Sequence, residues 1–207
     1  MSRMSSVLSI TLCAIVLAAL CVSTQAQTKP SDSAKPMGEQ VENPSYKAWA
    51  AFKPGSSATL KGTTQAQGQN INVESTSTLV SVNDDKATVE VATKVNANGN
   101  EMPQPTRKID VSHMVAKSEL DQPGKGFDPD LLKKASEESV TVPAGTFKAK
   151  VIEFTRTQGP MTMKIKAWFS EEVPGGMVKQ EMNGEGQQGG QSITMQTTME
   201  LASVDKK

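Results

Sequence analysis

Residues 147–169 read FKAKVIEFTRTQGPMTMKIKAWF, and this stretch decides the fold. Apolar and polar side chains alternate from Met161 to Phe169, which is typical of a strand with one buried and one solvated face. A similar alternation precedes the turn residues Gly159 and Pro160. The stretch therefore predicts two antiparallel strands joined by a tight turn.

The register of this predicted hairpin follows if residues 157–160 form its loop. Phe154 then faces Met163 across the pair. The neighbouring residues Val151 and Ile152 are both apolar, and this break in the alternation predicts a β-bulge. Beyond the bulge, one face is wholly apolar. The other face carries Trp168 and four lysines, which are Lys148, Lys150, Lys164 and Lys166.

The rest of the chain repeats this pattern. About nine alternating segments lie between Ser56 and Val204, separated by turn residues such as those at 98–100. Consecutive strands with short turns predict an antiparallel meander. We therefore expect a mainly β fold, a curved sheet or open half-barrel of about nine strands.

One or two short helices interrupt the strands. The first is expected over residues 44–52, with Asn43 as its N-cap and a proline in its first turn. The second is expected over residues 130–135, after Asp128 and Pro129.

The first 26 residues predict a signal peptide. Arg3 supplies the positive charge, and the apolar run at 10–22 is too short to span a bilayer. Cleavage is expected after Ala26. An alternative is a lipoprotein anchored at Cys21, but Leu20 occupies the place where such a signal needs a small residue, so we do not favour it.

Residues 27–42 are polar and contain prolines and serines, which predicts a flexible tether. Residues 43–207 then form a single β-rich domain. We expect an exported protein, periplasmic or extracellular, whose mature chain has no transmembrane span.

Composition excludes several classes of function. Both cysteines, Cys13 and Cys21, lie in the predicted signal, so the mature chain has no disulfide and no thiol nucleophile. The 22 basic residues are balanced by 22 acidic ones. Nucleic-acid binding normally requires a basic surplus, so we expect no nucleic-acid partner.

Catalytic and metal-binding patterns are absent from the sequence. The single histidine, His113, cannot form a zinc cluster alone, and no nucleophile-elbow or phosphate-loop motif occurs. We therefore predict a protein that is not an enzyme and has no catalytic residues, metal or cofactor. His113 has two interpretations. It is either a polar anchor in an apolar pocket or a histidine hydrogen-bonded to backbone near a strand end.

The methionines allow three interpretations. They either pack a core, form an adaptable wall for an apolar ligand, or hold Cu(I) through thioethers. Together with aromatic and aliphatic residues of the same faces, they define a set of ligand-cavity candidates. These candidates are Phe147, Phe154, Met161, Met163, Ile165, Phe169, Met195, Met199 and His113.

The four lysines of the predicted hairpin also have two interpretations. They either face an anionic partner, such as lipid headgroups, or form a solvated surface. Lys150 is expected opposite Lys166, which is unfavourable. A cation–π pair is expected between Lys148 and Trp168.

A faint internal repeat relates residues 71–82 to residues 193–204, with identities that include Leu79 and Leu201. Either a hairpin unit was duplicated, or two strands that face one core share a pattern.

The segment 140–178 carries a family resemblance. VPAGTF at 142–147, Trp168 and Pro174-Gly175 resemble the C-terminal half of a family of exported bacterial domains. Such domains look like the LolA/LolB-like lipoprotein-carrier fold. The resemblance implies an open antiparallel half-barrel around short helices, with an apolar concavity that holds an acyl chain.

Together these observations predict a non-enzymatic exported protein that binds an apolar or lipid-like ligand in a half-barrel. The alternative is a structural or protein-interaction module of the cell envelope with no small ligand.

Overall fold

A computed structural model of the chain describes residues 38–66, 68–97, 99–120, 129–188 and 191–207. The predicted signal peptide and most of the predicted tether lie outside the described residues. Within this part of the chain, no helix is long and apolar enough to cross a membrane.

Ten antiparallel strands form one open sheet in the described part of the chain, which confirms the predicted fold class. Their spatial order is β5-β4-β3-β2-β12-β11-β10-β9-β8, and β6 also pairs with β4. The strands are β2 (Ser57–Ala66), β3 (Gln69–Val82), β4 (Lys86–Ala97), β5 (Asn100–Pro103), β6 (Arg107–Ser112), β8 (Ser136–Val142), β9 (Gly145–Gln158), β10 (Met161–Phe169), β11 (Met177–Gln188) and β12 (Gln191–Asp205).

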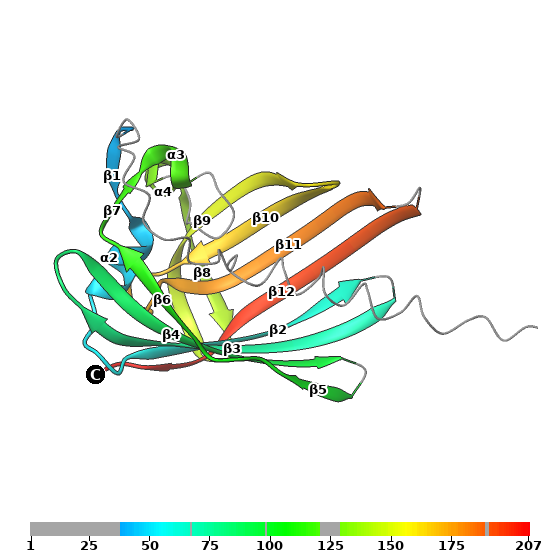
Figure 1. The fold of residues 1–207 in the computed structure, drawn as a ribbon, viewed down its shortest axis with the longest axis horizontal. Coiled ribbons are helices and arrows are strands. Elements are labelled where there is room, and N and C mark those ends of the chain that lie inside the picture. Colours follow the sequence, from blue (N-terminus) through cyan, green and yellow to red (C-terminus); the bar gives the residue numbers. More distant parts are fainter. Residues whose placement is uncertain (1–37, 67, 98, 121–128, 189–190) are drawn as a thin grey trace, which may run out of the picture.

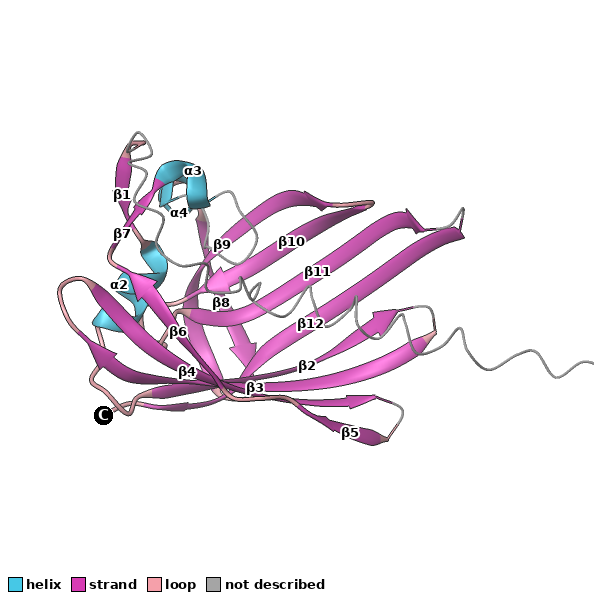
Figure 2. Cartoon of the chain, in the orientation of Figure 1, coloured by secondary structure: helices cyan, strands magenta, loops and turns pink. Residues whose placement is uncertain are grey.

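The sheet is strongly curved. Figure 1 shows strands β2–β5 along one side and β9–β12 along the other, with the short helices gathered at one end. Figure 2 shows that strands make up most of the described structure. The sheet therefore has a concave face, with the short helices at one of its ends.

Three short helices occur in the described residues: α2 (Pro44–Ala50), α3 (Lys117–Leu120) and α4 (Pro129–Lys133). The predicted N-cap is confirmed, because the Asn43 side chain accepts a hydrogen bond from the Ser45 amide at 3.0 Å. The second predicted helix corresponds to α4. Helix α3 was not predicted.

A small two-stranded sheet accompanies the large one. It pairs β1 (Gln40–Glu42) with β7 (Met114–Ala116). The end of the predicted tether is therefore a strand. Apolar residues alternate from Ile109 to Val115, but His113 interrupts the strand and separates β6 from β7.

The predicted hairpin exists as β9 and β10, but its register differs from the expected one. Phe154 lies opposite Ile165 rather than Met163, because the turn is tighter than expected. The shift is two residues. A two-residue shift leaves every side chain on its face, so alternation alone cannot exclude it.

The bulge predicted at Val151 and Ile152 is wrong. Pairing of β9 with β8 and with β10 runs through these residues without a shift. Both side chains are buried, and adjacent strand residues point to opposite faces, so β9 is covered on both faces here. Two-sided burial, rather than an inserted residue, breaks the alternation.

Without that bulge, the predicted lysine face is divided. Lys150 lies opposite Phe169, whereas Lys166 lies opposite Glu153 on the other face of the sheet. The expected Lys150–Lys166 repulsion is therefore absent from the described hairpin.

The sheet instead bends elsewhere. The pairing of β3 with β4 shifts between Leu79 and Ser81, and that of β12 with β2 shifts between Leu201 and Ser203. These two positions correspond in the repeat of residues 71–82 and 193–204, and both leucines are fully buried. The two repeated segments therefore share a backbone irregularity as well as a sequence pattern.

The core consists of three clusters, which we name by their content. The methionine cluster buries Ala66, Ile71, Val73, Val95, Ala97, Met163, Ile165, Met182, Met195 and Met199. The tryptophan cluster buries Ala58, Val142, Ala149, Val151, Trp168, Val173, Val178 and Leu201. The aromatic-end cluster buries Tyr46, Trp49, Leu79, Ala87 and Val89.

Candidate functional site

The methionine cluster is the candidate site. Its thioethers come from three neighbouring strands, since Met163 lies on β10, Met182 on β11, and Met195 and Met199 on β12. Met161 packs against them while partly buried. Strand pairing therefore collects on one surface residues that are up to 38 positions apart, from Met161 to Met199.

Gly184 lies in the middle of these thioethers. It pairs with Met163 on one side and with Met195 on the other. A Cβ atom at Gly184 would lie 3.1 Å from Met161 Cε, 3.5 Å from Met195 Cε and 3.6 Å from Met163 Cγ. The missing side chain therefore leaves a place on the strand onto which three flexible side chains converge.

The opposite wall of the cluster is aliphatic. Strands β3 and β4 contribute Ile71, Val73, Val95 and Ala97. Partly buried apolar side chains surround this core, and these are Leu60, Met102, Phe154 and Met161. The buried members of the cluster are all apolar. Arg156 lies at the margin, opposite Met163 on β9, with its guanidinium carbon 5.6 Å from the centroid of the Phe154 ring.

One polar pair lies in the same rows of side chains. Thr64 and Thr197 are 0% and 3% exposed, and their hydroxyl oxygens are 3.0 Å apart. Thr197 is flanked in its row by Met195 and Met199, and its direct partner across the sheet on β11 is Met182. The sequence analysis missed this pair because a threonine in an alternating strand is expected on the solvated face.

Helix α2 closes the other end of the concave face. The Trp49 indole lies directly on Gly175, whose φ is +77°, and a Cβ there would be 2.6 Å from the ring. The Gly175 amide donates to the Ala48 carbonyl at 3.1 Å. Tyr46 donates its hydroxyl to the Asn83 carbonyl at 2.8 Å. The aromatic end is thus fixed by directional contacts.

The structure brings together six of the nine predicted cavity residues. Phe154, Met161, Met163, Ile165, Met195 and Met199 belong to the methionine cluster or pack against it. Phe147 packs instead on the tryptophan cluster. A Cβ on Gly176 would lie 3.6 Å from Phe169, so Phe169 belongs near the aromatic end.

His113 also lies outside the methionine cluster. Its ring stacks on Tyr46 with centroids 4.4 Å apart, and its Nδ1 lies 2.8 Å from the Asp84 carbonyl. Its side chain is 36% exposed and Nε2 is 3.5 Å from Glu42. The structure supports the interpretation of His113 as a histidine bonded to backbone between two strands.

Met182 and Met102 were missed by the sequence analysis. Met182 lies in β11, where Gly184 and Gly186 interrupt the apolar alternation that would have identified its face. A Cβ on Gly186 would approach the Pro160 carbonyl at 2.5 Å, so close packing of β10 and β11 requires a glycine there.

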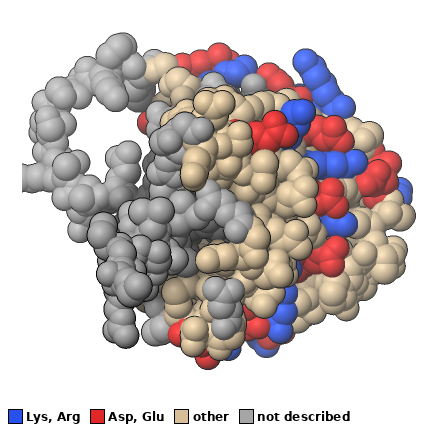
Figure 3. Space-filling model, turned by 90° about the vertical axis from the view of Figure 1, so that its right-hand side faces the viewer, with Lys and Arg blue, Asp and Glu red and all other residues tan. Residues whose placement is uncertain are grey.

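The four lysines of the hairpin are divided between the two faces of the sheet, and two of them form ion pairs. Lys166 lies 3.2 Å from Glu153, and Lys150 lies 3.7 Å from Glu171. Figure 3 shows cationic and anionic side chains interleaved on the visible described surface. This arrangement favours a solvated surface over a site for an anionic partner.

Trp168 differs from its predicted surface role. It is 5% exposed and its indole N–H donates to the Glu138 carboxylate. Lys166 and Lys179 lie 5.0 and 5.3 Å from its ring, in place of the expected Lys148. Trp168 therefore makes cation–π contacts, but with Lys166 and Lys179 rather than with Lys148.

Shifted pKa values occur at surface ion pairs, away from the methionine cluster. The hydrogen bond from Lys61 lowers the pKa of Glu74. Glu181, and then Glu200, raise the pKa of Lys179 through hydrogen bonds. These groups follow the ordinary electrostatics of salt bridges, and none lies among the methionines.

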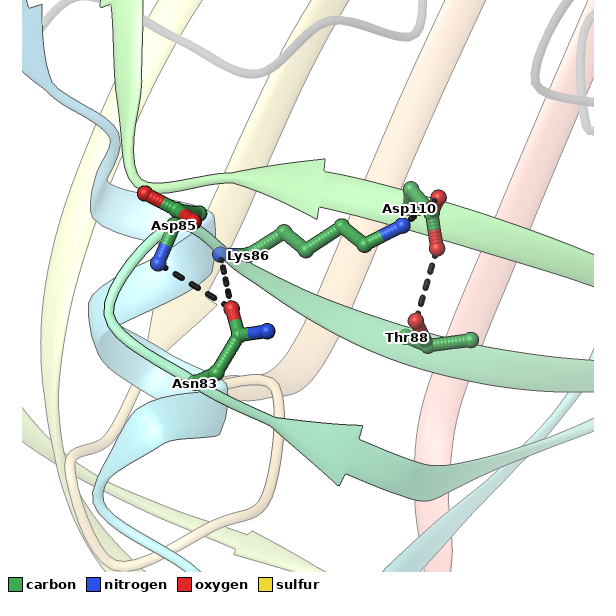
Figure 4. A network of polar contacts seen from close by, with 5 residues as sticks. All are labelled: Asn83, Asp85, Lys86, Thr88 and Asp110. Atoms are coloured by element: carbon green, nitrogen blue, oxygen red, sulfur yellow. Dashed lines mark hydrogen bonds and ion pairs between the residues drawn. The ribbon is translucent and has the colours of Figure 1, made fainter.

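The turn from β3 to β4 shows the same surface chemistry (Figure 4). Asn83 accepts hydrogen bonds from the Asp85 and Lys86 amides at 3.0 and 2.9 Å, as asparagine side chains commonly do in turns. Hydrogen bonds from Lys86 and then from Thr88 lower the pKa of Asp110.

The described residues contain no group of three or more His, Cys, Asp or Glu side chains placed to hold a metal ion. What the arrangement offers chemically is an apolar, polarisable surface with one pair of hydroxyl groups.

Comparison with known protein families finds a match, which covers most of the chain. The model of the DUF3108-like family matches residues 56–194, which is more than half of the chain. No match was found among curated proteins.

Several solved structures resemble the chain at low identity. A candidate exported protein with a YmcC-like fold from Bacteroides fragilis shares 11% identity over 75% of this chain and 97% of its own, with a TM-score of 0.45. A candidate lipoprotein from Parabacteroides distasonis shares 15% over 75% and 98%, also at 0.45. A candidate outer membrane lipoprotein-sorting protein domain from Vibrio parahaemolyticus shares 10% over 78% and 89%, at 0.27. At these values the likenesses carry no functional argument.

Proposed function

The chain belongs to the DUF3108-like family, and we propose that it binds an apolar, lipid-like ligand against the methionine cluster of its open sheet. In this proposal, the protein is exported to the cell envelope and acts by binding a ligand, without catalysis. The residues that contact the ligand are the methionines around Gly184, with Phe154 and Met102 at the periphery.

The observation that carries this proposal is the convergence of Met161, Met163 and Met195 over a residue without a side chain. A methionine has three rotatable bonds and a polarisable sulfur, so it adapts its shape more readily than leucine or valine. Four buried methionines in one cluster make a surface that can repack around an apolar molecule.

The energetics favour an aliphatic ligand. Burial of each methylene group contributes about 0.8 kcal/mol, so six methylenes supply about 5 kcal/mol before the losses of association. The buried members of the cluster carry no charge, so the desolvation of a charged group buried among them, away from Arg156 at the margin, would not be compensated.

Native mass spectrometry of the exported protein tests the proposal. The protein is purified from an exporting host without detergent, and the spectrum is searched for an added mass that is released as lipid. We expect such a mass on the wild-type protein. A clean mass for the polypeptide alone, unchanged after incubation with lipid extract, would contradict the proposal.

A matched pair of variants locates the binding surface. Gly184→Leu places a side chain among the three methionines, and we expect it to reduce the bound fraction at least fivefold, because it occupies the space of the ligand. Asn183→Leu adds the same side chain at the exposed neighbouring position, on the other face of β11, and should leave binding unchanged. Equal binding by both variants would place the ligand elsewhere.

A second candidate is a protein-interaction module of the envelope with a filled core. The near-complete burial of the methionine cluster favours it, since every core member is at most 9% exposed. Crosslinking in the exporting host, followed by identification of the crosslinked partner, tests this candidate. A specific protein partner together with a ligand-free mass would support it over ligand binding.

A further inference from the structure

The threonine pair sits at a defined place in the methionine cluster. Strand pairing puts Thr64 opposite Thr197 at the junction of β2 and β12. The next residues in the same rows are Gly62 and Ala66 on β2, and Met195 and Met199 on β12. Both hydroxyl groups therefore lie in an apolar surface that is shielded from water.

The pair has more hydroxyl protons than the contact between the two threonines uses. Each threonine hydroxyl has one proton to donate and two lone pairs to accept with. The contact between Thr64 and Thr197 uses one proton. Within the described part of the chain neither hydroxyl has another hydrogen-bond partner, so the second proton remains available for an acceptor.

The surroundings determine which acceptor suits this proton. The rows on β2, β11 and β12 that flank the pair contain alanine, glycine, valine, leucine, isoleucine, methionine and glutamine side chains besides the threonines. Arg156, opposite Met163 on β9, lies on the same face but three strands away from β12. A carboxylate buried here would lack a cation and would bear a large desolvation cost. An uncharged carbonyl oxygen accepts one hydrogen bond without that cost.

We infer that the Thr64–Thr197 pair donates a hydrogen bond to an uncharged carbonyl group of the bound ligand, as found in an ester-linked acyl chain. The inference rests on the proposed function, because it names the polar feature of the apolar ligand that the methionine cluster binds. The methionines contact the aliphatic part, and the threonine pair fixes the position of the ester along the β2–β12 junction.

The inference predicts that an ester binds more tightly than a hydrocarbon, and ligand displacement measures this preference. The full mature protein is loaded with N-phenyl-1-naphthylamine, a neutral apolar fluorophore, and titrated with methyl hexadecanoate or with heptadecane, a hydrocarbon of the same chain length. A net hydrogen bond changes affinity by about five- to tenfold, so the ester should displace the fluorophore at correspondingly lower concentration. Hexadecanoate at pH 8 should compete less well than the methyl ester.

Substitutions at Thr64 and Thr197 test whether their hydroxyl groups cause the preference for the ester. Thr64→Val with Thr197→Val removes both hydroxyls while keeping the shape of the side chains, and the preference for the ester should fall to about onefold. Thr64→Ser with Thr197→Ser keeps both hydroxyls and should retain the preference. Thr141 and Thr146 form an exposed cross-strand pair with oxygens 2.9 Å apart, and their replacement by valine is the matched control.

The outcomes separate the inference from the proposed function. Loss of the preference in the valine variant alone supports the inference. Displacement by ester and hydrocarbon at the same concentration in the wild type, or a preference that persists in the valine variant, overturns it while the proposed function stands. No displacement by either compound, and no binding of the fluorophore, overturns the proposed function itself.

Discussion

The two ends of the concave face are built from different kinds of contact. At the aromatic end, Trp49 lies on Gly175 and Tyr46 donates to the Asn83 carbonyl, so rigid rings are held in one arrangement. In the methionine cluster, flexible side chains meet over Gly184 and one hydroxyl pair is the polar contact. Rigid rings lose little conformational freedom when they are fixed, whereas methionines retain alternatives. The comparison indicates that one end fixes the fold and the other end can adapt.

Removal of the indole at the aromatic end should have the largest effect. We expect Trp49→Ala to lower the free energy of unfolding by about 3–5 kcal/mol, because a buried ring is replaced by a cavity between α2 and Gly175. Urea denaturation followed by circular dichroism measures the change. Lys47→Ala, at an exposed position of the same helix, is the control and should change stability by less than about 0.5 kcal/mol. A Trp49→Ala loss as small as that of the control would remove the distinction between the two ends.

Adding one methyl group at each of two glycines compares a site bounded by backbone with a site bounded by methionine side chains. A Cβ on Gly62 would collide with the Thr198 carbonyl oxygen, so Gly62→Ala forces β2 away from β12 and should cost about 1–3 kcal/mol. The three atoms nearest to a Cβ on Gly184 all belong to methionine side chains rather than to backbone, and Gly184→Ala should change stability by less than about 0.5 kcal/mol. The same urea titration measures both variants. Equal costs would mean that the methionines are as rigid as backbone.

Methionine-to-leucine exchange separates adaptability from volume. Met163→Leu with Met195→Leu preserves volume, so each change should cost less than about 1.5 kcal/mol. We nevertheless expect reduced retention of the apolar ligand, because leucine has fewer rotatable bonds. Urea denaturation gives the stability, and native mass spectrometry gives the bound fraction. Met114→Leu, at a 47% exposed position, is the control. Unchanged retention in the double variant would show that methionine flexibility is not needed.

The smallest effect is expected at a surface ion pair, which belongs to neither end. Lys61 lies 2.8 Å from Glu74 and lowers its pKa from the ordinary value of 4.5. A lowered pKa in the folded state stabilises the fold above pH 4.5, and this contribution is lost as the pH falls through the lowered pKa. Glu74→Gln should therefore cost about 0.5 kcal/mol at pH 7. The difference should shrink as the pH falls, which urea titrations at pH 7 and pH 3 measure. A difference as large at pH 3 as at pH 7 would point to a cause other than the ion pair.

Sequence periodicity predicted the fold class, most strands and helix α2, because alternation and capping are local properties. It also placed Met161, Met163, Met195 and Met199 on the apolar faces of their strands. It could not predict the hairpin register, since a two-residue shift preserves both faces. The adjacent buried residues Val151 and Ile152 were mistaken for a bulge because burial of both faces depends on contacts from distant strands.

The same limit applies to the candidate site. Met182 was hidden by the glycines that follow it, and the burial of Thr64 and Thr197 follows from their position in the middle of the sheet. Neither fact has a local signal. The resemblance to an open half-barrel supplied the general architecture, but strand pairing was needed to show which side chains meet.

Strand β12 has a consequence for how the molecule is made. It follows every other described strand of the large sheet in the sequence, yet it lies between β2 and β11 and joins the two halves of the sheet. Asp205 pairs with Ser57, so this junction is among the least local contacts in the fold. During synthesis from the N-terminus, the two halves remain unconnected until β12 has been made. The complete sheet is therefore expected to form slowly, because residues far apart in the sequence must meet to join its halves.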